Sequence, residues 1–236
     1  MKKIVLFTIF LLIFCFGAAG AEAGRLDMLY GVLSLPLHIK YYEVDDRDNV
    51  MLNPYLQVAT QTHRAVLDPA CPVYDWVIDA QGNLRVIAVV PHPRGRSYSD
   101  RYTRPEDGYS RDGGYVEKYG HVSALGGAPG RIGGEIINDY KNKRWVINNK
   151  SGRYSRGNFD RSPRQLACAA DLIQSMADPG GQGWGPVAYL LDYASSKLRK
   201  KEFANPSLRF GKPETNGLPY LLLDLGCEDT NTFSDN

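Results

Sequence analysis

Residues 73–90 read VYDWVID, AQGN and LRVIAVV in succession, and this stretch decides the fold class. Two runs rich in β-branched and aromatic residues flank a short polar turn that contains Gly82 and Asn83. This pattern predicts a β-hairpin. Pro91 and Pro93 end the second strand, because proline cannot donate a hydrogen bond to a neighbouring strand.

A second hairpin and a capped helix are predicted further along the chain. Strand-like runs at 132–138 and 144–148 flank a polar turn, which again indicates a hairpin. Ser162 precedes Pro163, and Gln165 stands three residues after the serine, so we expect a helix that begins with a capping box. The apolar face of this helix consists of Leu166, Ala169, Ala170, Ile173 and Met176 or Ala177.

The other elements are read from hydrophobic spacing. We expect a second helix at 186–201, a last strand at 219–225, a strand within 30–44 and a short helix within 52–67. The sequence therefore predicts one α+β domain over residues 24–227. Its antiparallel sheet is built from hairpins, and two or more helices pack on one face.

The two ends of the chain differ in character. Met1, Lys2 and Lys3 lead into an apolar run and then into small residues, which predicts a signal peptide over residues 1–23 and a periplasmic or secreted protein. No other run reaches the ~18 apolar residues of a membrane-spanning helix, so we expect no integral membrane segment after cleavage. Residues 228–236 are expected to form an acidic flexible tail.

The cysteines and histidines of the sequence limit the disulfides and metal sites that we expect. Cys71, Cys168 and Cys227 remain after cleavage and permit one disulfide in each chain, and the sequence leaves all three pairings open. The four histidines lie far apart, and neither a CxxC nor an HExxH motif is present. We therefore expect no metal site and no cofactor.

Charge and tyrosine gather in the middle of the chain. The formal net charge is only +2, yet residues 94–164 hold an excess of Lys and Arg interleaved with Tyr. Residues 91–129 lack sustained periodicity, so we expect a long exposed loop, and loops of that length are often functional. Arg and Tyr are enriched at protein interfaces and also suit nucleic acid, but an exported protein rarely meets nucleic acid. The candidate partner-binding residues are Arg94, Arg96, Arg101, Tyr102, Arg104, Tyr109, Arg111, Arg153 and Tyr154.

The most distinctive motif is GGEI at 133–136, followed by WVINNKSGRY at 145–154 and preceded by His121 and Ser123. It resembles a pattern of bacterial toxin-delivery and immunity systems, although Arg153 stands where that pattern often has His. Together with the export signal, the resemblance implies a periplasmic immunity protein. Such a protein binds and occludes a cognate secreted antibacterial effector, with a phospholipase-type toxin as the first candidate partner.

The same motif has a structural and a catalytic interpretation. Gly133 and Gly134 within a strand indicate a bulge or a close approach of another backbone, and residues 148–152 are turn formers. Alternatively, His121, Glu135 and Ser151 serve a secreted hydrolase or transferase that acts on an anionic or glycan substrate. A third possibility is a structural module of the envelope. A polar cleft around Glu135 would favour the enzyme.

Overall fold

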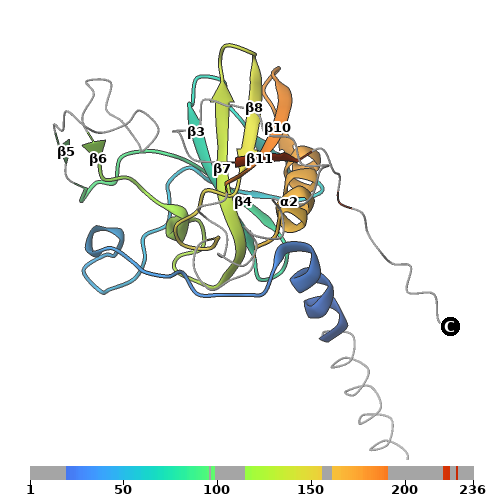
Figure 1. The fold of residues 1–236 in the computed structure, drawn as a ribbon. Helices are drawn as coiled ribbons and strands as arrows, with labels where there is room; N and C mark the ends of the chain where they lie inside the picture. The colour runs from blue at the N-terminus through green and yellow to red at the C-terminus, as the bar shows by residue number, and fades with distance from the viewer. Residues whose placement is uncertain are drawn as a thin grey trace, which may run out of the picture.

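The 73–90 hairpin lies in a seven-stranded sheet, which forms the centre of a single α+β domain (Figure 1). The computed structural model describes residues 20–95, 97–98, 115–155, 161–190, 220–223 and 227. The strands of the sheet are, in spatial order, β1 (Leu56–Ala59), β4 (Leu84–Ala88), β3 (Val73–Asp79), β7 (Gly130–Asp139), β8 (Arg144–Asn148), β10 (Gly183–Leu190) and β11 (Tyr220–Leu223). Both predicted hairpins are confirmed.

Neighbouring strands of the sheet are antiparallel except β8 and β10, which are parallel. Two small sheets accompany it. One pairs β2 (Ala65–Val66) with β9 (Ala177–Asp178), and the other pairs β5 (Ser97–Tyr98) with β6 (Tyr115–Val116). The sheet is therefore mixed, although the predicted antiparallel arrangement holds for most of it.

The turn between β3 and β4 shows why this hairpin is readable from sequence. Asp79 Oδ1 accepts hydrogen bonds from the backbone amides of Gln81 and Asn83. Gly82 has a φ of 85°, in the left-handed region that glycine adopts without strain. The turn residues thus satisfy the backbone locally and fix the register of both strands.

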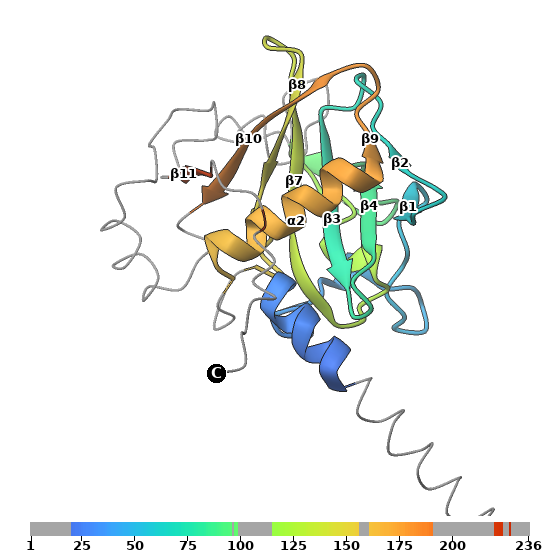
Figure 2. The same ribbon diagram turned by 90° about the vertical axis from the view of Figure 1, so that its right-hand side faces the viewer.

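Two helices cover one face of the sheet (Figure 2). The helix α2 (Pro163–Met176) begins with the predicted capping box, in which Ser162 Oγ accepts from the Gln165 amide at 3.2 Å. The second helix spans residues 20–30 and contributes Leu26 and Tyr30 to the main apolar core. Among the described residues, no helix has the length and apolar character needed to cross a membrane.

The opposite face is covered by irregular chain. After the helix at 20–30 the chain runs to the other side of the sheet, where it forms the 3-10 helix η1 (Tyr41–Glu43) (Figure 1). A second 3-10 helix, η3 (His121–Ala124), packs on the same side through a small apolar cluster of Val77, Ile87, Ala124 and Tyr154. This face therefore has a smaller apolar core and room for polar groups.

Two predicted elements are wrong, and a third is wrong over the part that the structure describes. Residues 186–190 belong to strand β10, because Ala188, Tyr189 and Leu190 are buried on both faces of the sheet, and such a run resembles a buried helix in sequence. The remainder of the predicted helix, 191–201, lies outside the described residues. Residues 31–44 are irregular apart from η1 and isolated bridges, and residues 52–67 hold β1 and β2 instead of a helix.

The predicted exposed loop at 91–129 is wrong in part. His92, Glu117, Tyr119 and all of η3 are buried, because these residues pack between the sheet and η1. Residues 99–114, which hold most of the predicted partner-binding side chains, lie outside the described residues.

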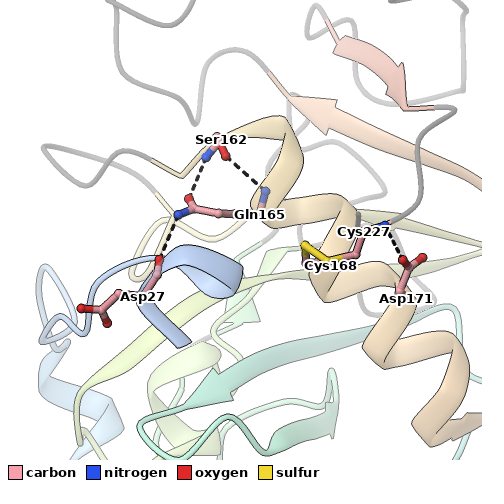
Figure 3. Close-up of a disulfide and its surroundings, with 6 residues drawn as sticks. All are labelled: Asp27, Ser162, Gln165, Cys168, Asp171 and Cys227. Carbon is pink, nitrogen blue, oxygen red and sulfur yellow. Dashed lines mark hydrogen bonds between the residues drawn. A yellow bond between two sulfur atoms is a disulfide. The ribbon is translucent and has the colours of Figure 1, made fainter. Parts of the chain in front are cut away.

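One disulfide fixes the end of the described chain. Cys168 on α2 is bonded to Cys227, and the backbone amide of Cys227 donates to Asp171 Oδ2 at 2.6 Å (Figure 3). Cys71 carries a free thiol. The pairing that the sequence left open is therefore Cys168–Cys227, which ties the segment after β11 to the helix layer.

Candidate functional site

A polar cavity of about 280 Å³ opens on the sheet face opposite α2. It lies between β3, β7, the residues around η1 and η3, and the segment after β8. The lining residues are Lys40, Tyr42, Glu43, Asp75, Lys118, Gly120, His121, Glu135, Lys150, Gly152 and Arg153. Charged groups dominate this wall, which distinguishes it from the apolar clusters of the core.

Two buried carboxyl groups lie side by side in the cavity. Asp75 on β3 and Glu135 on β7 are direct partners in the antiparallel register and share a face of the sheet. Side chains in such pairs have Cβ atoms about 4.5–5.5 Å apart. Asp75 is only 1% exposed, and its Oδ1 has no hydrogen-bond partner among the described residues. This oxygen is thus a buried acceptor that no described donor satisfies.

Burial raises the pKa of Glu135, and the nearby Asp75 carboxylate adds to that rise. The ammonium groups of Lys150 and Lys118 oppose the rise in part. The Lys150 Nζ lies 3.3 Å from Glu135 Oε1. A carboxyl group that keeps its proton above the ordinary range is suited to act as a general acid.

His121 is held by an acceptor on each side of its ring. Its Nε2 lies 2.9 Å from the carbonyl oxygen of Gly134, and its Nδ1 lies 3.5 Å from Asp75 Oδ2. Because a carbonyl oxygen only accepts, Nε2 is the donor in the contact with Gly134. The two contacts fix the ring of His121 against β3 and β7 at the cavity wall.

Asparagine side chains of the NNKSGRY segment form hydrogen bonds with the backbone beside the cavity. Asn148 Oδ1 accepts from the amides of Glu135 at 3.1 Å and Lys150 at 2.8 Å. Asn149 bonds both the amide and the carbonyl of Leu190 on β10. The motif thus orients the two charged residues whose side chains meet at the cavity, Glu135 and Lys150, which supports its structural interpretation.

Ser151 also forms hydrogen bonds with the backbone of this segment. Its side chain is completely buried, and its Oγ accepts from the amides of Arg153 and Tyr154. Ser151 does not line the cavity, so the structure does not bring it to the position that its predicted catalytic role requires.

Gly134 confirms the expected close approach of another backbone. A Cβ atom at this position would lie 1.8 Å from the carbonyl oxygen of Asn148, a distance that no side chain tolerates. Gly133 is less crowded, with the carbonyl oxygen of Trp76 3.0 Å from its ideal Cβ position. The amide and carbonyl of Gly133 both bond Ser155 Oγ.

Arg153 and Tyr154, predicted as partner-binding residues, are directed into the protein. Arg153 Nη2 donates to both carboxylate oxygens of Glu43, at 3.0 and 3.2 Å, and Arg153 Nη1 bonds the carbonyl of His38. Tyr154 is completely buried and donates its hydroxyl proton to the carbonyl of Ala128. Burial leaves neither side chain on the surface that a partner would contact.

Of the remaining predicted partner-binding residues, the structure describes the side chain of Arg94. It pairs with Asp46 at 2.5 Å and donates to the carbonyl of Val44. The predicted residues that lie outside the described part of the chain are Arg96, Arg101, Tyr102, Arg104, Tyr109 and Arg111.

Several cavity residues were not predicted from the sequence. Asp75 gave one usable signal, because a carboxylate within the apolar run VYDWVID needs a partner or a function. Lys150 lies within the motif WVINNKSGRY, to which no role for this side chain was assigned. Lys40, Glu43 and Lys118 gave no signal, since charged residues in loops are ordinary. Among the described residues, no group of three or more His, Cys, Asp or Glu side chains is placed to hold a metal ion.

Comparison of the chain with models of protein families, with curated proteins and with solved structures found no match.

Proposed function

We propose that the protein is a hydrolase or transferase that acts on an anionic or glycan substrate in this cavity. The observation that carries the proposal is the buried pair of Asp75 and Glu135 at the base of an open, charged cavity. A pair of carboxyl groups whose surroundings push their pKa values apart is one recurring arrangement for general-acid catalysis. Glu135 is the proton donor, and Asp75 is the carboxylate beside it.

For a glycosidic bond the proposed reaction is a hydrolysis. The Glu135 proton moves to the leaving oxygen as the carbon–oxygen bond breaks, and that oxygen keeps the electron pair of the bond. The Asp75 carboxylate stabilises the positive charge that develops on the sugar ring. Water then bonds to the carbon and returns one proton to Glu135. In a transferase, an acceptor hydroxyl takes the place of water.

Substitution of the proton donor tests this proposal. We expect Glu135→Gln to lower kcat at least ~100-fold on methyl glycosides of neutral and acidic sugars, whose alkoxide leaving group needs a proton, while circular dichroism shows an unchanged fold. Asp79→Asn is the matched control, because Asp79 is a buried carboxylate on β3 that does not line the cavity. Equal turnover by the wild type and Glu135→Gln, or no wild-type turnover on any of these glycosides, would contradict the proposal.

A second candidate function is the inhibition of a secreted effector, as the motif resemblance implies. The observation that favours it is an exposed apolar strip along residues 28–41, since such patches mark contact surfaces. The residues of this strip are Met28, Val32, Leu33, Leu35, Leu37, Ile39 and Tyr41, which are 43–68% exposed. The partner is then a cognate antibacterial effector of phospholipase type, met in the periplasm or outside the cell.

A genetic experiment tests this candidate. Deletion of the gene is expected to be toxic only while a neighbouring effector gene is present. A copy with Leu35→Asp should fail to protect, because a charge at the centre of the strip opposes apolar contact. Survival of the deletion strain with the effector present would exclude the inhibitor.

A further inference from the structure

The charges of the cavity are paired unequally. Arg153 Nη2 lies 3.0 Å from Glu43 Oε1, Lys150 Nζ lies 3.3 Å from Glu135 Oε1, and His121 Nδ1 lies 3.5 Å from Asp75 Oδ2. Lys40 and Lys118 also line the wall, and neither forms an ion pair with a carboxylate among the described residues. Lys40 Nζ donates instead to the hydroxyl of Tyr42 at 2.9 Å. The cavity therefore keeps positive charge for a ligand.

Asp75, which also lines the cavity, requires a hydrogen-bond donor and not a negative charge. Within the described part of the chain no donor reaches the buried Asp75 Oδ1, and a buried acceptor in that state costs about 1–3 kcal/mol. A ligand hydroxyl that donates to this oxygen removes the cost. An inorganic anion brings its negative charge close to the carboxylate when it approaches this oxygen, whereas a sugar separates its hydroxyl donors from its anionic group.

We propose that the cavity binds a single sugar unit that carries an anionic group. Lys40 and Lys118 bind the anionic group, and Asp75 accepts a hydrogen bond from a ring hydroxyl. The inference rests on this cavity being the working site, as in the proposed function. A volume of about 280 Å³ is near the lower end of ligand pockets, roughly 300–1,000 Å³, and suits one ring. Lys118 thereby becomes a specificity-determining residue.

Calorimetric titration of the full chain tests the inference without turnover. The probes are D-glucuronate, D-galacturonate and D-glucose 6-phosphate, each compared with the neutral D-glucose or D-galactose and with inorganic phosphate. We expect the charged sugars to bind at least about tenfold more tightly than either the neutral sugars or phosphate, because only they satisfy both sides of the cavity. The uronates and the sugar phosphate distinguish a carboxylate from a phosphate as the natural anion.

Substitutions of Lys118, with a control at Lys141, test the role of Lys118 in binding the anionic group. Lys118→Gln should weaken binding of the charged sugars about tenfold and leave the neutral sugars unchanged, whereas Lys141→Gln, in the exposed turn after β7, should change neither. Lys118→Arg should retain the preference. Equal binding of charged and neutral sugars, equal binding of phosphate, no binding, or an effect of Lys141→Gln as large as that of Lys118→Gln would overturn the inference.

The Glu135→Gln variant separates this inference from the proposed function. It should still bind the charged sugar while losing turnover, because it keeps Lys40, Lys118 and Asp75. Selective binding without turnover by the wild type would support the sugar site and contradict the catalytic proposal.

Discussion

At the scale of single residues, the motif acts through its backbone contacts as much as through its charged groups. Asn148 binds the amide of Glu135, and Gly134 permits the approach of the Asn148 carbonyl. These contacts place one carboxyl group beside Asp75, whose own position follows from the register of β3 against β7. The acid pair is thus produced by two segments that are distant in sequence.

The close approach at Gly134 predicts a severe effect of one methyl group. Gly134→Ala should lower the free energy of unfolding by about 1–3 kcal/mol or more, because the new Cβ meets a backbone carbonyl that cannot rotate away. Urea denaturation measures the change. Gly152→Ala is the control, since a Cβ at Gly152 meets no atom within 4 Å, and an equal loss in both variants would contradict this explanation.

The raised pKa of Glu135 predicts a pH dependence of stability. Above the ordinary value of 4.5 the unfolded chain has released this proton while the folded chain still holds it, so stability falls as pH rises toward the folded pKa. The unfolding free energy of the wild type minus that of Glu135→Gln should therefore be larger at pH 5 than at pH 8. A difference that stays constant or grows with pH would contradict the raised pKa.

At the scale of elements, sequence prediction succeeds where the signal is local. The β3–β4 turn and the Ser162 capping box are formed by side chains within a few residues of the backbone that they bind, and both are predicted correctly. Strand β10 is mistaken for a helix because its burial comes from β8, β11 and the core, which no short window contains. The cavity has the same origin, since Asp75 and Glu135 meet only through pairing of distant strands.

The disulfide is an element-scale restraint with a measurable contribution. It closes a loop with a sequence separation of 59 residues, which in the chain-entropy treatment stabilises the fold by about 4 kcal/mol. The double variant Cys168→Ala with Cys227→Ala should lose stability of that order in urea denaturation, and Cys71→Ser should lose far less because it breaks no bond. An unchanged midpoint after reduction of the wild type would contradict the expected contribution.

At the scale of the whole molecule, the sheet separates two environments. One face carries the apolar core with α2 and the helix at 20–30, and the other carries the charged cavity lined by residues of η1 and η3. A helix layer that the disulfide ties to the end of the described chain thus lies opposite a polar site. This division favours a protein whose chemistry takes place in the cavity. The disulfide agrees with the proposed export, because disulfides persist in oxidising compartments.

The central claim is that burial beside Asp75 raises the pKa of Glu135, so that this carboxyl group keeps its proton above the ordinary range. A ¹³C NMR titration of glutamate-labelled protein measures this directly, with the Glu135 carboxyl signal assigned by its absence in Glu135→Gln. The claim predicts a titration midpoint above the ordinary value of 4.5. A midpoint at or below that value would contradict it.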